Sequence, residues 1–89
     1  MDNAQLRAVM IYQLGAFNTS GSAIDENTVH GDILTDEGPG NATPKRIYKA
    51  FIRATFVMNG LPDPTWPEAW MDLTVAELAD ELLPPEPQP

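Results

Sequence analysis

The amino-acid sequence predicts an all-α fold, a small bundle of three to four helices. Apolar residues recur at steps of three and four within residues 3–16, 44–59 and 75–83, the spacing that lines one face of a helix. No segment keeps the alternation of apolar and polar residues that a half-buried strand requires. Because 89 residues suffice for one domain, we expect a single helical domain over residues 1–83 and a disordered proline-rich tail at 84–89.

The first predicted helix covers residues 3–16. Asp2 or Asn3 can cap its first turn, and Gly15 can end it. Few polar residues lie opposite its apolar stripe, so we expect this helix to be buried on more than one side. The stripe consists of Leu6, Val9, Met10, Leu14 and Phe17, and the opposite face of Gln5, Ala8 and Tyr12.

Residues 18–43 form a long, weakly patterned connection with many glycines, serines and asparagines. An unstructured connection of this length is uncommon in a small domain, so we expect part of it to be held against the core through a short helical turn. His30, the single histidine, lies in this connection and is expected to be solvated. The apolar residues that can hold the connection are Ile24, Val29, Ile33 and Leu34.

The central helix, residues 44–59, has the clearest boundaries. Thr43 is a good N-cap, Pro44 suits the first helical position, and Gly60 suits the position after the last turn. The predicted inward face consists of Ile47, Ala50, Phe51, Ala54 and Met58, widened by Ile52, Phe56 and Val57.

A proline-rich turn at 61–64 follows the central helix. We expect a short helix to begin at Asp63 or Thr65, with Trp66 and Trp70 on one face because they lie four residues apart. Both tryptophans are candidates for core packing, and either is a possible anchor for a partner.

The last helix is predicted over residues 75–83. Thr74 followed by Glu77 forms the pattern of a capping box. The expected inward residues are Val75, Leu78, Ala79 and Leu82.

Charge is unevenly distributed along the chain, which carries a net charge of −8. Residues 1–37 hold six acidic residues and one basic, residues 38–62 hold four basic and no acidic, and residues 63–89 hold seven acidic and no basic. The stripe formed by Lys45, Lys49 and Arg53 is either a solvated face neutralised by acids of the loop or the last helix, or a docking face for an acidic partner or a phosphate backbone. The four central bases all lie on the central helix. They are Lys45, Arg46, Lys49 and Arg53.

Composition excludes several classes of protein. The absence of cysteine excludes disulfides, thiolate metal sites and cysteine nucleophiles. No apolar run is long enough to span a membrane, and the acidic N-terminus is unlike a signal peptide, so we expect a cytoplasmic protein. The acidity disfavours direct binding of nucleic acid. No catalytic constellation is visible, and we expect neither enzymatic activity nor a cofactor nor membrane contact.

Three segments resemble the acyl carrier protein family. They are Gln-Leu-Gly at 13–15, Leu-Pro-Asp at 61–63, and Leu-Thr-Val-Ala-Glu-Leu-Ala at 73–79. The resemblance spans about residues 6–83 and implies a carrier-protein-like helical bundle. It also implies that Thr43 stands at the position of the serine that bears the family's phosphopantetheine arm.

The chain departs from that family in three respects. The family's Asp-Ser-Leu is replaced by Ala-Thr-Pro at 42–44, its usually acidic central helix is basic, and the connection before Thr43 is longer. Because Thr43 is also the expected helix cap, these departures indicate a carrier-like fold without the prosthetic group.

We therefore predict a non-enzymatic, acidic protein-interaction module that docks to a protein partner. Its predicted binding residues are Lys45, Arg46, Lys49, Arg53, Trp66 and Trp70. The alternative is an acidic inhibitor of the type encoded by phages or mobile elements, which would occupy a basic or nucleic-acid-binding surface of a host protein. Its predicted acidic face consists of Asp32, Asp36, Glu37, Glu77, Asp80 and Glu81.

Overall fold

The computed structural model describes residues 1–19, 21–35 and 43–83, and it confirms the small all-α class. The described ranges contain helices and a single isolated antiparallel bridge, with no strand. The predicted disordered tail at 84–89 lies outside the described residues. In chain order the elements are α1 (Asn3–Gly15), α2 (His30–Ile33), α3 (Pro44–Met58), the 3₁₀ helix η1 (Trp70–Asp72) and α4 (Val75–Leu82).

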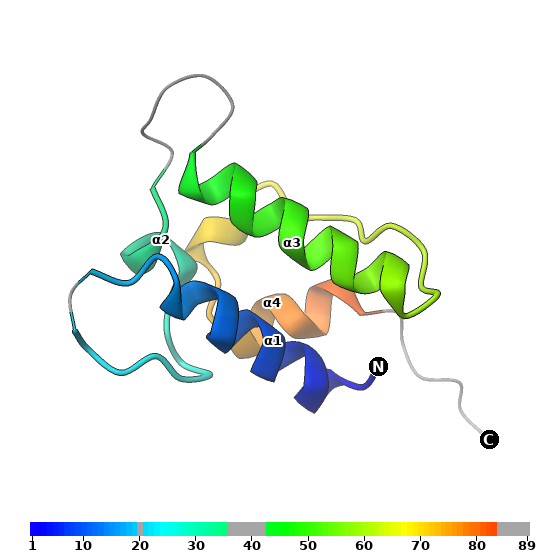
Figure 1. The fold of residues 1–89 in the computed structure, drawn as a ribbon, viewed down its shortest axis with the longest axis horizontal. Coiled ribbons are helices and arrows are strands. Elements are labelled where there is room, and N and C mark those ends of the chain that lie inside the picture. Colours follow the sequence, from blue (N-terminus) through cyan, green and yellow to red (C-terminus); the bar gives the residue numbers. More distant parts are fainter. Residues whose placement is uncertain (20, 36–42, 84–89) are drawn as a thin grey trace.

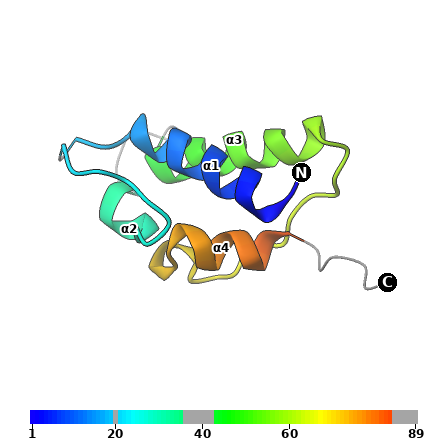
Figure 2. The ribbon, with the colours of Figure 1, turned by 90° about the horizontal axis from the view of Figure 1, so that it is seen from below.

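The helices form two layers. α1 and α3 lie side by side in one layer, and α4 packs beneath α1 in the other (Figures 1 and 2). The short α2 lies at one end of the bundle and contacts η1 (Figure 1). The core between these elements consists of Leu6, Met10, Leu14, Leu34, Tyr48, Ile52, Phe56, Trp70, Val75, Leu78, Ala79 and Leu82.

α1 begins at a complete capping box. Asp2 accepts a hydrogen bond from the backbone amide of Gln5, and the Gln5 side chain accepts one from the amide of Asp2. The predicted stripe faces inward, with Leu6, Met10 and Leu14 buried. The expectation that α1 is buried on more than one side is wrong for this chain alone, because the opposite face, including Tyr12 at 79% exposure, is open to solvent.

The long connection is held against the core as expected. Leu34 is buried and Val29 is half-buried, with α2 as the short helical turn between them. The backbone amide of His30 donates to the Leu73 carbonyl (3.1 Å), and the amide of Val75 donates to the Thr28 carbonyl (3.1 Å). These bonds tie the connection to the start of α4.

α3 begins at the predicted residue and ends one residue before the predicted end, and its inward face differs in part from the predicted one. Thr43 caps its first turn, and Gly60 follows its last turn with a φ of 70°. Ile52 and Phe56 of the predicted face point into the core, together with Tyr48, which was not predicted, and the rest of that face does not. The buried residues are Tyr48, Ile52 and Phe56, whereas Ala50, Phe51, Ala54, Val57 and Met58 are exposed and Ile47 is half-buried.

The segment between α3 and α4 corrects a further expectation. Residues 61–67 contain no helix, and the only helical turn before α4 is η1, which begins at Trp70. Prolines at 62, 64 and 67 remove backbone donors that a helix would need, which explains the extended course. α4 matches its prediction, with the Thr74–Glu77 capping box formed and all four expected residues buried.

Candidate functional site

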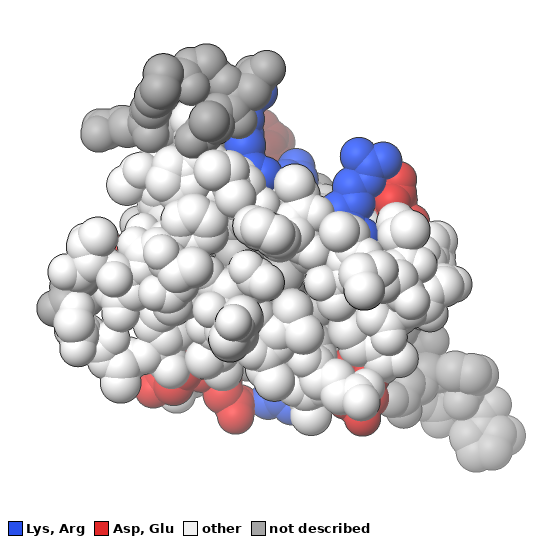
Figure 3. Space-filling view, in the orientation of Figure 1, with Lys and Arg blue, Asp and Glu red and all other residues white. Residues whose placement is uncertain are grey.

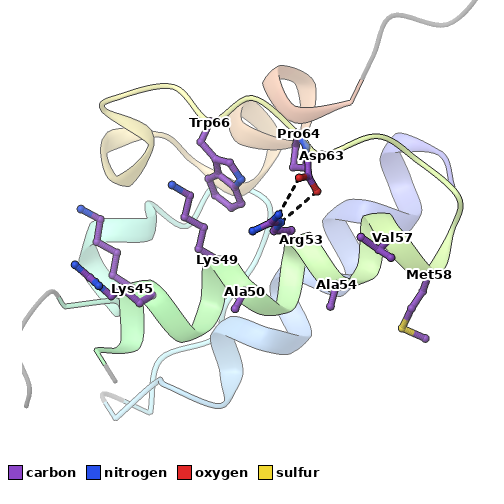
Figure 4. A pocket seen from close by; sticks show the side chains of 11 residues that line it. Lys45, Lys49, Ala50, Arg53, Ala54, Val57, Met58, Asp63, Pro64 and Trp66 are labelled. Atoms are coloured by element: carbon purple, nitrogen blue, oxygen red, sulfur yellow. Dashed lines mark hydrogen bonds and ion pairs between the residues drawn. The ribbon is translucent and has the colours of Figure 1, made fainter. Parts of the chain in front are cut away.

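An open groove runs along α3 on the described surface. It encloses about 1060 Å³ between the outward side of α3 and the extended segment at 61–67 (Figure 4). The groove brings five of the six predicted binding residues together. Its lining consists of Lys45, Arg46, Lys49, Ala50, Arg53, Ala54, Val57, Met58, Asp63, Pro64 and Trp66.

Basic side chains form one wall of the groove. Lys45, Lys49 and Arg53 are spaced by one helical turn, and Figure 3 shows basic side chains gathered at this edge of the molecule. Arg53 is held by Asp63 through two hydrogen bonds, from Nε to Oδ1 (3.2 Å) and from the terminal nitrogen to Oδ2 (2.9 Å). This bidentate contact raises the pKa of Arg53, first through hydrogen bonding and then through the negative charge.

Asp63, in the turn after α3, pairs with one of the basic residues of α3. The described residues show Arg53 paired with Asp63, from the segment directly after α3, and none of the stripe paired with the last helix. Asp63 can reach Arg53 because the extended segment folds back along α3 (Figure 4). The two lysines stand on the same wall, where Lys49 is exposed and Lys45 half-buried.

Trp66 forms the opposite wall. Its ring lies 5.2 Å from the Lys49 ammonium, measured to the ring centroid, in a cation–π arrangement (Figure 4). Behind it, the Trp70 ring packs edge-to-face at 4.8 Å. Trp66 is half-buried, so one part of its ring remains available to the groove.

Trp70 is not placed to anchor a partner. Its side chain is 3% exposed and belongs to the core. It stacks on Tyr48 with a centroid distance of 5.9 Å and meets the His30 ring edge-on at 5.6 Å. Of the two predicted anchors, Trp66 therefore lines the surface groove and Trp70 supports it from inside.

His30 and Tyr48 form a buried polar pair that the sequence did not reveal. His30 is fully buried, contrary to the expectation of a solvated histidine, because α2 turns its ring into the core. Its Nδ1 lies 2.8 Å from the Leu73 carbonyl, and its Nε2 lies 2.9 Å from the Tyr48 hydroxyl. A carbonyl only accepts, so Nδ1 carries the proton and Nε2 of the neutral ring accepts from Tyr48.

Burial shifts the titration of both groups. It lowers the pKa of His30, although the hydrogen bond to the Leu73 carbonyl acts in the opposite direction, and it raises the pKa of the Tyr48 phenol. Both groups are therefore neutral at pH 7. The pair has no opening to solvent, which makes it a structural link between α2, α3 and the segment before α4.

Thr43 does not fit the role of a phosphopantetheine attachment site. Its side chain is 4% exposed, and its hydroxyl accepts a hydrogen bond from the Arg46 amide at 3.3 Å. A phosphodiester at this oxygen would remove the cap and place a charged group where the chain is packed. Thr43, which the resemblance alone aligns with the carrier family's serine, is thus used to begin α3.

The residues of the predicted acidic face are divided among several elements. Asp32 is exposed on α2, whereas Asp36 and Glu37 lie outside the described residues. On α4, Glu77 belongs to the capping box, and its hydrogen bonds with the Thr74 backbone and side chain lower its pKa. Asp80 accepts from the side-chain amide of Asn3 (Nδ2 to Oδ1, 2.7 Å), and Glu81 is exposed beside it.

Comparison with known proteins adds no relationship. No protein-family model matches the chain, and neither the curated proteins nor the solved structures contain a match. Within the described residues, no group of three or more histidine and acidic side chains is arranged to hold a metal ion. None of the helices described has the length and apolar character needed to cross a bilayer.

Proposed function

We propose that this chain is a non-enzymatic protein-interaction module with a carrier-protein-like bundle and no phosphopantetheine arm. The element order supports the carrier-like fold: a first helix, a long connection with a short turn, a strong central helix, a 3₁₀ turn and a final helix. The buried, capping hydroxyl of Thr43 supports the absence of the arm. The proposed setting is the cytoplasm.

The proposed partner presents an acidic segment to the α3 groove. The observation that carries this proposal is the contact between Lys49 and Trp66, which places an exposed cation and an aromatic face on one groove. Carboxylates of the partner would meet Lys45 and Lys49 at the basic wall. Its apolar side chains would lie on Trp66 and on the small apolar residues of α3, as in other helix-in-groove complexes.

The net charge of −8 does not prevent this interaction. Salt at physiological concentration screens exposed charges beyond roughly 8 Å, so an approaching segment responds mainly to the charges that line the groove. Among the described lining residues, Asp63 is the one acid, and it is already paired with Arg53. The groove is therefore locally basic in an otherwise acidic protein.

A peptide titration tests the proposal. We would measure binding by calorimetry, and map it by amide chemical shifts, with a helix-forming peptide that carries glutamates on one side and leucines on the other. The expected result is that shifts gather along α3 and around Trp66, and that the Lys45→Glu/Lys49→Glu variant loses binding. A peptide with lysines in place of the glutamates is the control ligand.

A matched variant on the other side of the molecule separates the two candidate functions. Asp80→Lys/Glu81→Lys reverses two charges of the predicted acidic face on α4 and leaves the groove intact. Retained binding of the acidic peptide by this variant supports the groove. If the wild type instead prefers the lysine peptide, and this variant no longer binds it, the acidic inhibitor replaces the proposed function.

A further inference from the structure

The outward surface of α1 and α3 has an uncharged face. α1 contains one charged residue, Arg7, in its 13 positions. Figure 3, which looks onto these two helices, shows no charged side chain in the middle of the described surface. The uncharged face consists of the exposed residues Ala4, Gln5, Ala8, Tyr12 and Ala16 around α1, and Ala50, Phe51, Ala54, Val57 and Met58 on α3.

The composition of the uncharged face is that of an interface core. Tyr12 is 79% exposed, Phe51 48% and Met58 85%. Aromatic residues and methionine are enriched at the centres of protein interfaces, and charged residues are depleted there. Large apolar patches with a polar rim mark sites of association. The few polar residues of α1 predict that this helix is buried on more than one side. The chain alone leaves the second side exposed, and another protein surface on the uncharged face would bury it.

The two edges of the uncharged face carry opposite charges. Beyond α3 stand the basic residues of the groove, among them Lys49. Beyond α1, the acids that contact the helix are Glu26, paired with Arg7, and Asp80, bonded to Asn3. Figure 3 shows this separation, with basic side chains along the edge at α3 and mainly acidic ones along the opposite edge.

We propose that a second copy of this chain covers the uncharged face, related by a two-fold axis that runs along α1 and α3. A two-fold interface must be self-complementary, because the same patch is used on both copies. Rotation about this axis places the basic edge of each copy opposite the acidic edge of the other. A two-fold axis across the helices would instead oppose like charges.

This dimer goes beyond the proposed docking function. Ala50, Ala54, Val57 and Met58 belong to both surfaces, whereas the two residues that test the dimer belong to the uncharged face alone. Neither Tyr12 nor Phe51 lines the groove. The net charge of −8 on each copy weakens association at long range. Because the described charges border the uncharged face and do not lie on it, we expect a dimer that forms as protein concentration rises at physiological salt.

Sedimentation equilibrium over a wide concentration range tests the proposal with the full chain. The wild type is expected to pass from monomer to dimer, and Tyr12→Glu/Phe51→Glu is expected to remain monomeric. Ala23→Glu/Ala69→Glu is the matched control, because it adds the same charge at two exposed loop positions outside the face. Circular dichroism verifies that each variant is folded. Tyr12→Gln/Phe51→Gln, which adds no charge, is the second variant should the first lose its helices.

The orientation of the dimer is tested by a carbodiimide cross-linker, which joins amines directly to carboxylates. In a mixture of isotopically labelled and unlabelled chains, we expect mixed-label links from Lys45 or Lys49 to Glu26 or Asp80. A wild type that stays monomeric at the highest concentration overturns the proposal. So does a dimer that survives the Tyr12 and Phe51 substitutions, since it must use another surface.

Discussion

The Tyr48 hydroxyl donates to Nε2 of His30 over 2.9 Å in the core, and this bond joins α3 to α2. The same histidine binds the Leu73 carbonyl through Nδ1, so three separate segments meet at one ring. Both side chains are fully buried. No water can replace either partner without a rearrangement of the core, so loss of one partner leaves the other unsatisfied.

We therefore expect Tyr48→Phe to destabilise the fold. The substitution keeps the ring and its stacking on Trp70 but removes the donor to His30. An unsatisfied buried acceptor costs about 1–3 kcal/mol. Urea unfolding measures the difference in the free energy of unfolding. Tyr12→Phe removes the same hydroxyl from an exposed ring and should change stability by less than about 0.5 kcal/mol. Equal effects of the two substitutions would contradict the assignment.

Stability should decrease as the pH falls through the titration of His30. Burial lowers the pKa of His30 from its ordinary value of 6.5, so the unfolded chain binds a proton at a pH at which the folded chain does not. The contribution of the neutral ring is fully present above about pH 6.5 and is lost progressively below it. The pKa of Glu77 is lowered from its ordinary value of 4.5, so this residue affects stability only in a more acidic range.

The measurement is the urea midpoint between pH 7.5 and 5.5, compared with that of His30→Gln. The variant lacks the titrating ring, so its stability should vary less over this interval, whatever its absolute value. An identical pH dependence in both proteins would show that His30 does not titrate differently on folding.

Gly31→Ala should destabilise the protein because of a close backbone approach. A Cβ at this position would lie 3.0 Å from the Met71 carbonyl oxygen in η1. The backbone at this packed end of the bundle cannot move aside as a flexible side chain can. We therefore expect the substitution to lower the free energy of unfolding by about 1–3 kcal/mol. Thermal unfolding followed by circular dichroism measures it.

Gly15→Ala is the matched control for Gly31→Ala. A Cβ at Gly15, in the last turn of α1, meets no atom within 4 Å. Alanine there should stabilise the helix by about 0.5–1 kcal/mol, since glycine loses more conformational entropy on folding. If both alanine variants shift stability in the same direction, the contact with Met71 does not explain the Gly31 position.

Thr43 is expected to behave as a helix cap in stability measurements. Thr43→Ala should lower the free energy of unfolding by about 1 kcal/mol, within the range of about 0.5–2 kcal/mol, because the Arg46 backbone amide loses its acceptor. Thr43→Ser keeps the hydroxyl and should retain most of the stability. The wild type should show no mass increase with a phosphopantetheinyl transferase and coenzyme A. A gain of about 340 Da at Thr43 would restore the carrier interpretation.

The sequence predicted the basic residues of the candidate site but not the groove in which they lie. The basic stripe on α3 follows from residues spaced by four, which any α-helix brings to one side. Its second wall depends on the path of residues 61–67, which pass back along α3 and bring Trp66 to Lys49. Asp63 reaches Arg53 by the same path. No periodicity encodes such a path, because extended segments take their course from the surface on which they pack.

The sequence by itself determined where the three long helices begin. Asp2, Thr43 and Thr74 each accept from an amide three residues ahead, an interaction complete within a single turn and hence visible in the sequence. The inward face of α4 could likewise be predicted from the sequence of the helix itself, because its apolar residues form only one stripe.

Tertiary structure alone decided which face of α3 turns inward. Apolar residues surround much of that helix, so its own pattern permits more than one orientation. The observed orientation buries Tyr48. Its hydroxyl donates a hydrogen bond to His30, whose ring lies in the core because of the position of α2. A buried polar group must find a partner from another element, and that requirement couples segments 18 residues apart in the chain. It leaves Phe51 and Met58 outside, on the surface where we place the second copy.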